Sequence, residues 1–230
     1  MIDNLRLKKV YSSSVDNLLR DFYIPILENA KQYDRITGYF SPTVFSICAK
    51  GLSSMITNGG KMRIISSIEL DQKTFELIKN SSELAEKEIE KYTIPQDPIE
   101  LRTELEKNYY QLFIALLNAG VIELKIALTT TGNGILHEKI GIITDADGKR
   151  LSFSGSNNET VYGWTQNIEN FKVFPEWQEA SKGYFNDDLN KFETYWSGSS
   201  EKLIVLSVDD ALKQKVFRSA SPEENIESLI

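Results

Sequence analysis

The sequence predicts one α/β domain in which a mixed β-sheet is flanked by helices on both faces. Short β-prone runs alternate with helical stretches along most of the 230 residues. Two of these runs, 36–40 and 61–65, enclose a helical segment, which favours a parallel pair with a right-handed crossover. Two later runs, 136–144 and 149–154, enclose the turn-rich Asp145-Ala-Asp-Gly148, which predicts an antiparallel hairpin. A parallel unit and a hairpin in one chain together predict a mixed sheet.

The first half of the chain is expected to supply most of the helices. Segment 16–30 places its apolar residues on one side of a helix. Ser41-Pro42 begins a second helix, and Asn58-Gly59-Gly60 ends it. Pro95 and Pro98 separate two further helical segments. The helices expected in this half span residues 16–30, 42–56, 71–92 and 99–118.

The second half is expected to supply most of the strands. The sequence predicts strands over residues 121–128, 136–144, 149–154, 171–174 and 203–208, the first of them by its alternating and β-branched residues. Helices are expected over residues 187–195 and 210–218. The domain is expected to span residues 1–218, and residues 219–230 to form a tail or the start of a linker. No internal repeat is found, so the motif described below occurs once.

The composition is that of an ordinary globular protein, with 41% hydrophobic and 26% charged residues. The apolar runs are short and interrupted by charge, so we expect no membrane span. The N-terminus, Met-Ile-Asp-Asn-Leu-Arg, has no basic-then-apolar signal pattern. The single cysteine, Cys48, excludes an internal disulfide and fits a reducing compartment. We therefore expect a cytoplasmic protein.

The charge is unevenly distributed along the chain. A net charge of −7 argues against a nonspecific binder of polyanions, because such proteins usually carry basic surfaces. Residues 1–65, however, hold nine Lys/Arg against five Asp/Glu. The segment around the only histidine is close to neutral and includes Lys139, Lys149, Arg150 and Lys172. A cleft that binds phosphate is therefore compatible with the sequence.

That only histidine, His137, stands two residues before Lys139 on an expected strand, so the two side chains should share one face. An imidazole in this position can attack phosphorus in a phosphodiester. The neighbouring ammonium can neutralise the nonbridging oxygens as negative charge builds on them. The pair is therefore a candidate catalytic unit.

The next strand ends in a turn of small residues, Gly155-Ser156-Asn157-Asn158. The Ser156 hydroxyl, the Asn158 amide and the freed backbone N–H groups can donate to phosphate oxygens. A helix that begins near Glu159 would add affinity for anions. Further along, Glu169 can accept a hydrogen bond from the imidazole and fix its tautomer.

His-x-Lys, followed by Gly-Ser-x-Asn and Asn-x-Glu, resembles the signature of the phospholipase D superfamily, and most of all its bacterial nuclease branch. The resemblance is sharp over residues 135–172 and looser over 34–68. In the looser part, Thr37-Gly-Tyr-Phe-Ser41 and Asn58-Gly-Gly-Lys-Met-Arg63 resemble the nuclease modules of some restriction enzymes. Such modules are often attached to ATP-dependent helicases.

One position departs from the family pattern. The family usually has an aspartate five positions after the lysine, where this chain has Thr144, and Asp145 follows one position later. Either the hairpin carries a one-residue shift or the role of the aspartate is absent. Asp145 is therefore not counted among the catalytic residues.

The resemblance implies a two-step displacement that uses neither a metal nor another cofactor. A histidine attacks to give a phosphohistidine, and a second histidine protonates the leaving oxygen and then activates water. Family members with one motif per chain pair two chains, so the resemblance implies a homodimer that shares one active site. The implied catalytic residues are His137, Lys139, Ser156, Asn158 and Glu169, and the expected substrate-binding residues are Tyr39, Ser41 and Gly155.

Each of these residues also has a structural interpretation. A lone histidine is most often structural or exposed, Ser156 can cap a helix, and Asn158 can form a turn. For Tyr39 and Ser41, a core aromatic and a helix cap are at least as plausible as substrate contacts. One histidine and one cysteine cannot make a metal site.

The leading hypothesis is a nuclease that cuts DNA in a restriction or anti-phage role. A phospholipase-type phosphodiesterase would use the same chemistry. The competing hypothesis from a different class is a DNA-binding or regulatory module that needs a helicase or ATPase domain or partner. RNA also remains open as a substrate.

Overall fold

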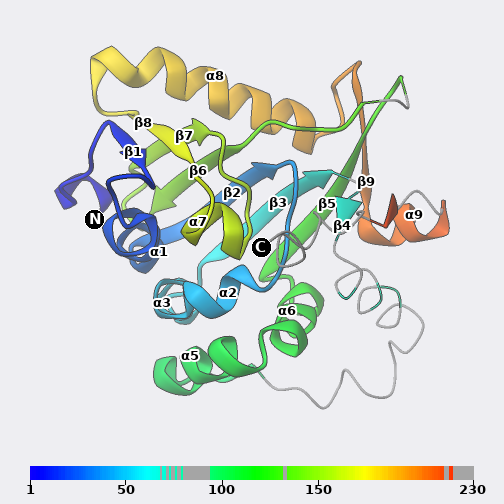
Figure 1. Cartoon of the computed structure of the whole chain (residues 1–230), viewed down its shortest axis with the longest axis horizontal. Coiled ribbons are helices and arrows are strands. Elements are labelled where there is room, and N and C mark those ends of the chain that lie inside the picture. The colour runs from blue at the N-terminus through cyan, green and yellow to red at the C-terminus, as the bar shows by residue number, and fades with distance from the viewer. Residues whose placement is uncertain are drawn as a thin grey trace, which may run out of the picture.

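Eight strands form one mixed sheet in the computed structural model, which describes residues 1–67, 69–70, 73, 76, 79, 94–131, 134–214 and 218–219. Figure 1 shows this sheet through the middle of the molecule. In spatial order its strands are β1 (Val10–Ser12), β8 (Asn170–Pro175), β7 (Arg150–Gly155), β6 (Ile140–Asp145), β2 (Ala30–Thr37), β3 (Lys61–Ser67), β5 (Ile122–Thr129) and β9 (Leu203–Ser207). A separate parallel pair joins β4 (Glu69–Leu70) to β10 (Arg218–Ser219).

The pairing of the strands confirms the predicted mixed sheet. β2 and β3 are parallel neighbours, as the crossover rule predicts, and β5 also pairs parallel with β3. β6 and β7 form the predicted antiparallel hairpin, and β8 continues it. The three-residue edge strand β1 pairs antiparallel with β8, with Val10 opposite Lys172, and was not predicted. Three residues give too short a period for alternation to be detected.

Helices cover both faces of the sheet, as predicted (Figure 1). On one face, α8 packs against β6, β7 and β8. The opposite face carries the N-terminal helices and the α5–α6 pair, and α7 lies beside α1. The helices are η1 (Ile2–Asn4), the π-helix η2 (Leu19–Tyr23), α1 (Ile24–Glu28), α2 (Val44–Ile47), α3 (Ala49–Thr57), α5 (Pro98–Lys107), α6 (Tyr109–Asn118), α7 (Val161–Thr165), α8 (Glu179–Trp196) and α9 (Val208–Lys213).

Two apolar clusters fill the spaces between the sheet and its helices. The larger one lies under the N-terminal helices and includes Phe22, Phe153 and Phe171, whose rings contact one another. The smaller one lies under α8 and includes Leu136, Phe185 and Phe192. Among the residues that the structure describes, no helix combines the length and the apolar character needed to cross a bilayer.

Two of the expected helices are interrupted. The helix expected over 42–56 is broken at Cys48, where φ is −105° and ψ is 16°. After the break, α3 packs tightly on α1 at Gly51, where an added Cβ would lie 2.9 Å from the Ile24 carbonyl oxygen. The helix expected over 99–118 is broken at Asn108, whose side chain donates to Glu104. Asparagine favours such helix ends because its amide bonds locally.

Several element boundaries also differ from those expected. The helix expected over 16–30 ends at Glu28, and β2 replaces the strand expected over 36–40, because this strand already begins at Ala30. The strand expected over 136–144 begins only at Ile140. The helix expected over 187–195 extends over Glu179–Trp196, and the one expected over 210–218 spans Val208–Lys213. The helix expected over 71–92 lies outside the described residues, apart from 73, 76 and 79, which are helical. The tail beyond residue 219 also lies outside them.

Candidate active site

Four strand ends bring the motif segments to one edge of the sheet. Ile36 near the end of β2 pairs with Ile140 at the start of β6, and Ile140 pairs with Ser154 near the end of β7. Gly155 then pairs with Phe171 near the start of β8. Because neighbouring strands in this part of the sheet are antiparallel, the segments that precede β6 and β8 meet those that follow β2 and β7. Segments far apart in the sequence thereby form one site.

His137 and Lys139 lie in the segment that precedes β6, outside any strand, which corrects the expectation that both stand on a strand. His137 is exposed, whereas Lys139 is 4% exposed. The Lys139 ammonium donates to the His137 carbonyl oxygen at 2.7 Å. The Lys139 carbonyl oxygen accepts from Gly155 N at 3.2 Å, which ties this segment to the end of β7. The ammonium is thus held beside the backbone of the histidine.

Gly38, which follows β2, marks the point where the other motif reaches the lysine. A Cβ added at Gly38 would lie 3.3 Å from both Lys139 Nζ and Asn158 Oδ1. Asn158 Oδ1 accepts from the backbone N–H of Tyr39 at 3.2 Å and from the Thr37 hydroxyl at 3.5 Å. The structure therefore brings Lys139 and Asn158 together around a residue without a side chain. Sequence reasoning noted the Thr37-Gly-Tyr run but did not assign Gly38 or Thr37 to the site.

Ser156 and Glu169 form a direct pair. The Ser156 hydroxyl donates to Glu169 Oε2 and accepts from Asn170 N at 3.1 Å. Asn167 Nδ2 donates to Glu169 Oε1 at 3.3 Å. Glu169 is only 8% exposed. Among the described residues its carboxylate is hydrogen-bonded to Ser156 and Asn167, and the predicted contact with the imidazole of His137 is not formed.

Ser13 also belongs to this part of the site, although its sequence context gave no signal. It follows the edge strand β1, and its hydroxyl accepts from Glu169 N at 2.9 Å. The same hydroxyl donates to the Asn167 carbonyl oxygen at 2.8 Å, and Ser13 N donates to the Glu169 carbonyl oxygen at 2.9 Å. The N-terminal segment thus fixes the backbone that carries Glu169.

The three expected substrate-binding residues have different surroundings. A Cβ added at Gly155 would lie 2.1 Å from the Asn170 carbonyl oxygen, so glycine is required there for the close approach of β7 and β8. Tyr39 is half-buried and supports Asn158 through its backbone. The Ser41 hydroxyl is buried and accepts from the Thr43 hydroxyl at 2.9 Å, beside the start of α2. Ser41 is therefore placed as a helix-start residue.

A buried polar network lies behind the turn 155–158. Arg35 and Glu159, both fully buried, form an ion pair in which Arg35 Nε lies 2.9 Å from Glu159 Oε2. The Tyr33 hydroxyl donates to the same carboxylate at 3.1 Å, and Arg35 Nη2 donates to the Asn157 carbonyl oxygen. Burial raises the pKa of the Glu159 carboxyl, and the charge of Arg35 opposes that rise. The network fixes the backbone on which Ser156 and Asn158 stand.

Aromatic side chains extend the network beyond Asn157. Asn157 Nδ2 donates to the Tyr23 hydroxyl, and the Tyr23 ring stacks on Trp164 of α7 with 3.5 Å between centroids. Thr160 caps α7 by accepting from Gly163 N at 3.0 Å. Because α7 has only five residues, its dipole is small, and the expected contribution of a helix start to anion binding is not supported. The segment after the turn is instead anchored by packing.

Asp145 has a structural role, because its carboxylate accepts hydrogen bonds from backbone N–H groups. It is 3% exposed, and its carboxylate accepts backbone N–H groups from Ile2 at 3.0 Å, Asp147 at 3.0 Å and Lys149 at 2.9 Å. It thus holds the β6–β7 turn and the N-terminus at the edge of the sheet opposite the site. Thr144, at the family's usual aspartate position, pairs with Arg150 in the ladder.

Some of the cations near the motif in sequence lie away from the site. Lys149 pairs with Asp3 at 3.2 Å, and Arg150 pairs with Glu176 at 2.6 Å, both near the β6–β7 turn. Lys139 is the cation whose ammonium lies beside Gly38 and the His137 backbone. Within the described part of the chain, no group of three or more His, Cys, Asp or Glu side chains is arranged to hold a metal ion.

Comparison with known proteins gives distant similarity in structure. No family model and no curated protein matches the sequence. The chain is similar to NucT from Helicobacter pylori, with 16% identity and a TM-score of 0.40 over 79% of this chain and 94% of that one. It is also similar to Nuc from Salmonella typhimurium, a phospholipase D family member, with 16% identity and a TM-score of 0.41 over 82% and 93% of the two chains. For phosphatidylserine synthase from Haemophilus influenzae, the identity is 13% and the TM-score 0.46, over 87% of this chain and 40% of that one. These similarities are distant, with identities of 13–16% and TM-scores below 0.5.

Proposed function

We propose that the chain is a metal-independent phosphodiesterase that acts through a phosphohistidine intermediate. The observation that carries this proposal is the meeting of Lys139 and Asn158 around Gly38, beside the backbone of the exposed His137. A nucleophile, a cation and an amide donor then lie at one edge of the sheet. These are the groups that a displacement at phosphorus requires.

In the first step the imidazole of His137 attacks phosphorus, a P–N bond forms, and the P–O bond to the leaving alcohol breaks. The Lys139 ammonium stabilises the charge that builds on the nonbridging oxygens. Asn158 Oδ1 is occupied by Tyr39 N and Thr37, so its amide N–H groups are left to donate to the same oxygens. In the second step water attacks phosphorus, and the P–N bond breaks to restore the imidazole.

The leaving oxygen needs a proton, and the water in the second step needs a base. His137 is the only histidine of the chain and is consumed as the nucleophile. We propose that His137 of a second copy supplies both functions, in a homodimer that shares one active site. The partner's histidine gives its proton to the leaving alcohol in the first step and removes a proton from water in the second.

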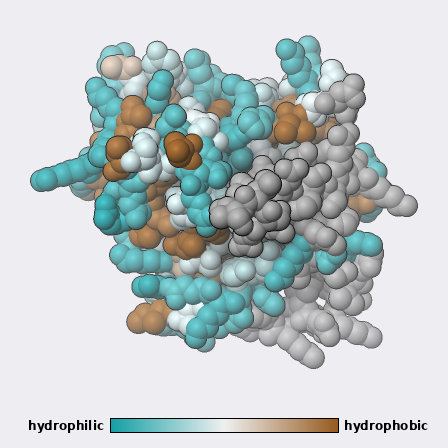
Figure 2. Space-filling view, viewed as in Figure 1, coloured by the Kyte–Doolittle hydropathy of each residue, from teal (hydrophilic) through white to brown (hydrophobic). Residues whose placement is uncertain are grey.

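Exposed apolar residues beside the site support such a dimer. Ile168, next to Glu169, is 86% exposed, and Val15, two residues after Ser13, is 82% exposed. Tyr162 on α7 is 55% exposed. Figure 2 shows hydrophobic residues exposed among hydrophilic ones on the face that carries α7. We propose that the second copy covers these three residues.

DNA is the substrate that we propose, in a restriction or anti-phage role. The support comes from the motifs, which resemble the nuclease branch most closely, and from the Lys139 ammonium, which a dimer would double. A local pair of cations can bind phosphate on a protein that is acidic overall. We further propose that cleavage in the cell requires a helicase or ATPase domain or partner, on the basis of the looser resemblance over residues 34–68 to helicase-attached nuclease modules.

The test is cleavage of duplex DNA in excess chelator by the wild-type protein and by His137→Ala, with molar mass measured in solution alongside. We expect chelator-resistant cutting by a dimer and no cutting by the variant. Cutting that stops on addition of chelator, an active His137→Ala protein, or an active strict monomer would each contradict the proposal. Hydrolysis of phosphatidylcholine vesicles without cleavage of nucleic acid would replace DNA by lipid as the substrate. DNA binding that survives His137→Ala, without nicking even when an ATPase partner is added, would favour a binding module.

A further inference from the structure

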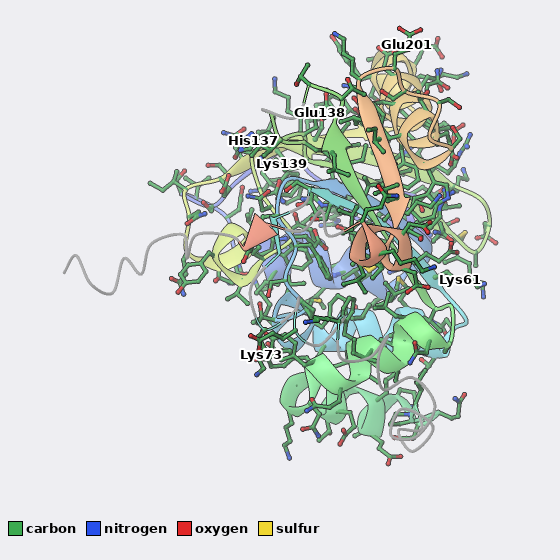
Figure 3. All side chains as sticks on the ribbon, turned by 90° about the vertical axis from the view of Figure 1, so that its right-hand side faces the viewer. Lys61, Lys73, His137, Glu138, Lys139 and Glu201 are labelled. Carbon is green, nitrogen blue, oxygen red and sulfur yellow. The ribbon has the colours of Figure 1, made fainter. Side chains whose placement is uncertain are left out.

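The residue between His137 and Lys139 contacts the opposite side of the sheet from the lysine. Successive side chains of β6 point to opposite faces of the sheet, and those of Ile140 and Ile142 belong to the core under α8. Glu138 continues this alternation, because its carboxylate accepts from Lys191 of α8 at 2.9 Å. Lys139, in contrast, reaches the Gly38 side. Figure 3 labels the three neighbours close to one another, and Glu138 contacts α8 through Lys191.

The segment that carries His137 is attached to α8 through the side chains on both sides of the histidine. Residues 134–139 belong to no strand. Leu136 is buried in the cluster under α8, with Phe185 and Phe192. Glu138 and Leu136 therefore attach this segment to α8 from one side. The His137 backbone lies between these two attachments.

α8 provides a rigid base for these attachments. Phe185 and Phe192 of this helix are fully buried. Asp188 accepts from the buried Ser152 hydroxyl at 2.7 Å, and Glu193 accepts from Arg63 at 2.8 Å. At the C-terminal end, the Trp196 carbonyl oxygen accepts from Lys125 Nζ at 2.8 Å. α8 is thus fixed to three strands of the sheet.

The surroundings of Glu138 are only partly exposed to water. The side chains of Lys191 and Glu138 are 41% and 39% exposed. The hydrogen bond to Glu138 raises the pKa of Lys191. Burial, followed by the charge of Glu138, raises the pKa of Tyr195, one helical turn further along α8. The Glu138 carboxylate therefore interacts with two residues of α8, Lys191 and Tyr195.

We propose that Glu138 and Lys191 are positioning residues, whose ion pair fixes the backbone of His137 relative to Lys139 and Asn158. This inference rests on the proposed function of the site, because it assigns to α8 the task of holding the nucleophile. Neither residue touches the reacting atoms. A loss of the ion pair should therefore lower the rate of the chemical step while leaving substrate binding nearly unchanged.

The test is a double-mutant cycle on the full chain, with Lys191→Met, Glu138→Gln and the double variant. With bis(p-nitrophenyl) phosphate as the probe, we expect Lys191→Met to lower kcat about tenfold, with KM changed by less than about twofold. In the Glu138→Gln background, the same change should alter kcat by less than about twofold. The matched control is Arg102→Met. It removes the ion pair on α5 in which Arg102 Nε lies 2.8 Å from Glu106 Oε1, and whose side chains have a similar exposure. This variant should leave kcat unchanged.

A second readout does not depend on activity. Because His137 is the only histidine, the imidazole region of an NMR spectrum reports on this residue alone when the affinity tag lacks histidine. We expect Lys191→Met to shift the His137 Cε1–H signal in the wild-type background and not in the Glu138→Gln background.

Equal effects of Lys191→Met in both backgrounds, or none in either, would overturn the positioning role. An active His137→Ala protein would instead overturn the proposed function. In that case the His137 Cε1–H signal in the single and double variants would still show whether the Glu138–Lys191 ion pair affects the surroundings of His137. The two failures are therefore distinguishable.

Discussion

The ammonium of Lys139 and the carbonyl oxygen of His137 are joined by a hydrogen bond of 2.7 Å, so the cation is held by the backbone of the residue beside which it acts. Lys139 is nearly buried, and this bond limits where its charge can move. The proposed mechanism uses that charge in the transition state. The lysine is thus positioned before substrate arrives.

Lys139→Met should therefore lower kcat about 10²-fold or more, because a donor directed at developing charge is lost. The measurement is the hydrolysis rate of a phosphodiester at saturating substrate. Lys172→Met is the control, since Lys172 is exposed on β8 and should be dispensable for kcat. A loss of less than about tenfold in Lys139→Met would contradict the role of the lysine.

Gly38→Ala tests the meeting point of the two motifs. Its Cβ would lie 3.3 Å from Lys139 Nζ and from Asn158 Oδ1, tighter than ordinary contact, so both groups must shift. A shift of a few tenths of an ångström should lower kcat about tenfold. Gly183→Ala on α8, where no atom lies within 4 Å of the added Cβ, should leave kcat unchanged. Equal rates for the two variants would show that Gly38 lies outside the site.

Glu159→Gln tests the buried network behind the turn. The substitution leaves Arg35 buried without a charged partner, which should cost about 3–5 kcal/mol in the free energy of unfolding. Urea denaturation measures this quantity. Glu106→Gln, which removes an exposed pair on α5, should cost about 1 kcal/mol or less. A similar small loss in both variants would mean that the Arg35–Glu159 pair does not hold the turn.

The Arg150–Glu176 pair predicts a dependence of stability on pH. The hydrogen bond from Arg150 lowers the pKa of Glu176 below its usual value of 4.5. Because the folded state binds the proton less readily, the pair stabilises the fold above that value and loses its contribution as the pH falls through the lowered pKa. Glu176→Gln should thus cost up to about 1 kcal/mol at pH 7 and less at pH 2. A cost that is the same at both pH values would contradict this assignment.

Much of the fold could be predicted from local sequence signals. The parallel β2–β3 unit and the β6–β7 hairpin follow from turn residues and β-branched runs, and the structure has both. The break at Cys48 could not be predicted, because the residues on either side favour a continuous helix. The break at Asn108 was missed, although asparagine favours helix ends through local hydrogen bonds. The edge strand β1 was too short to give a period.

Only part of the candidate site could be predicted from the sequence. Residues of the motif, such as His137 and Lys139, stand out by type and spacing. Ser13 and Gly38 do not, because their place in the site depends on strand pairing between segments more than 90 residues apart. Arg35 is a charged residue in a strand of a buried sheet. It could have been noticed as one that needs an acidic partner, but the sequence does not say which.

The central claim is that His137 forms a covalent bond to phosphorus. The direct measurement is to mix the protein with a nitrophenyl phosphodiester, quench in base, and map the adduct by peptide mass spectrometry. The account predicts a phosphoryl adduct on the peptide that contains His137, together with a burst of nitrophenol before steady turnover. Turnover with no burst, and no adduct on that peptide, would contradict it.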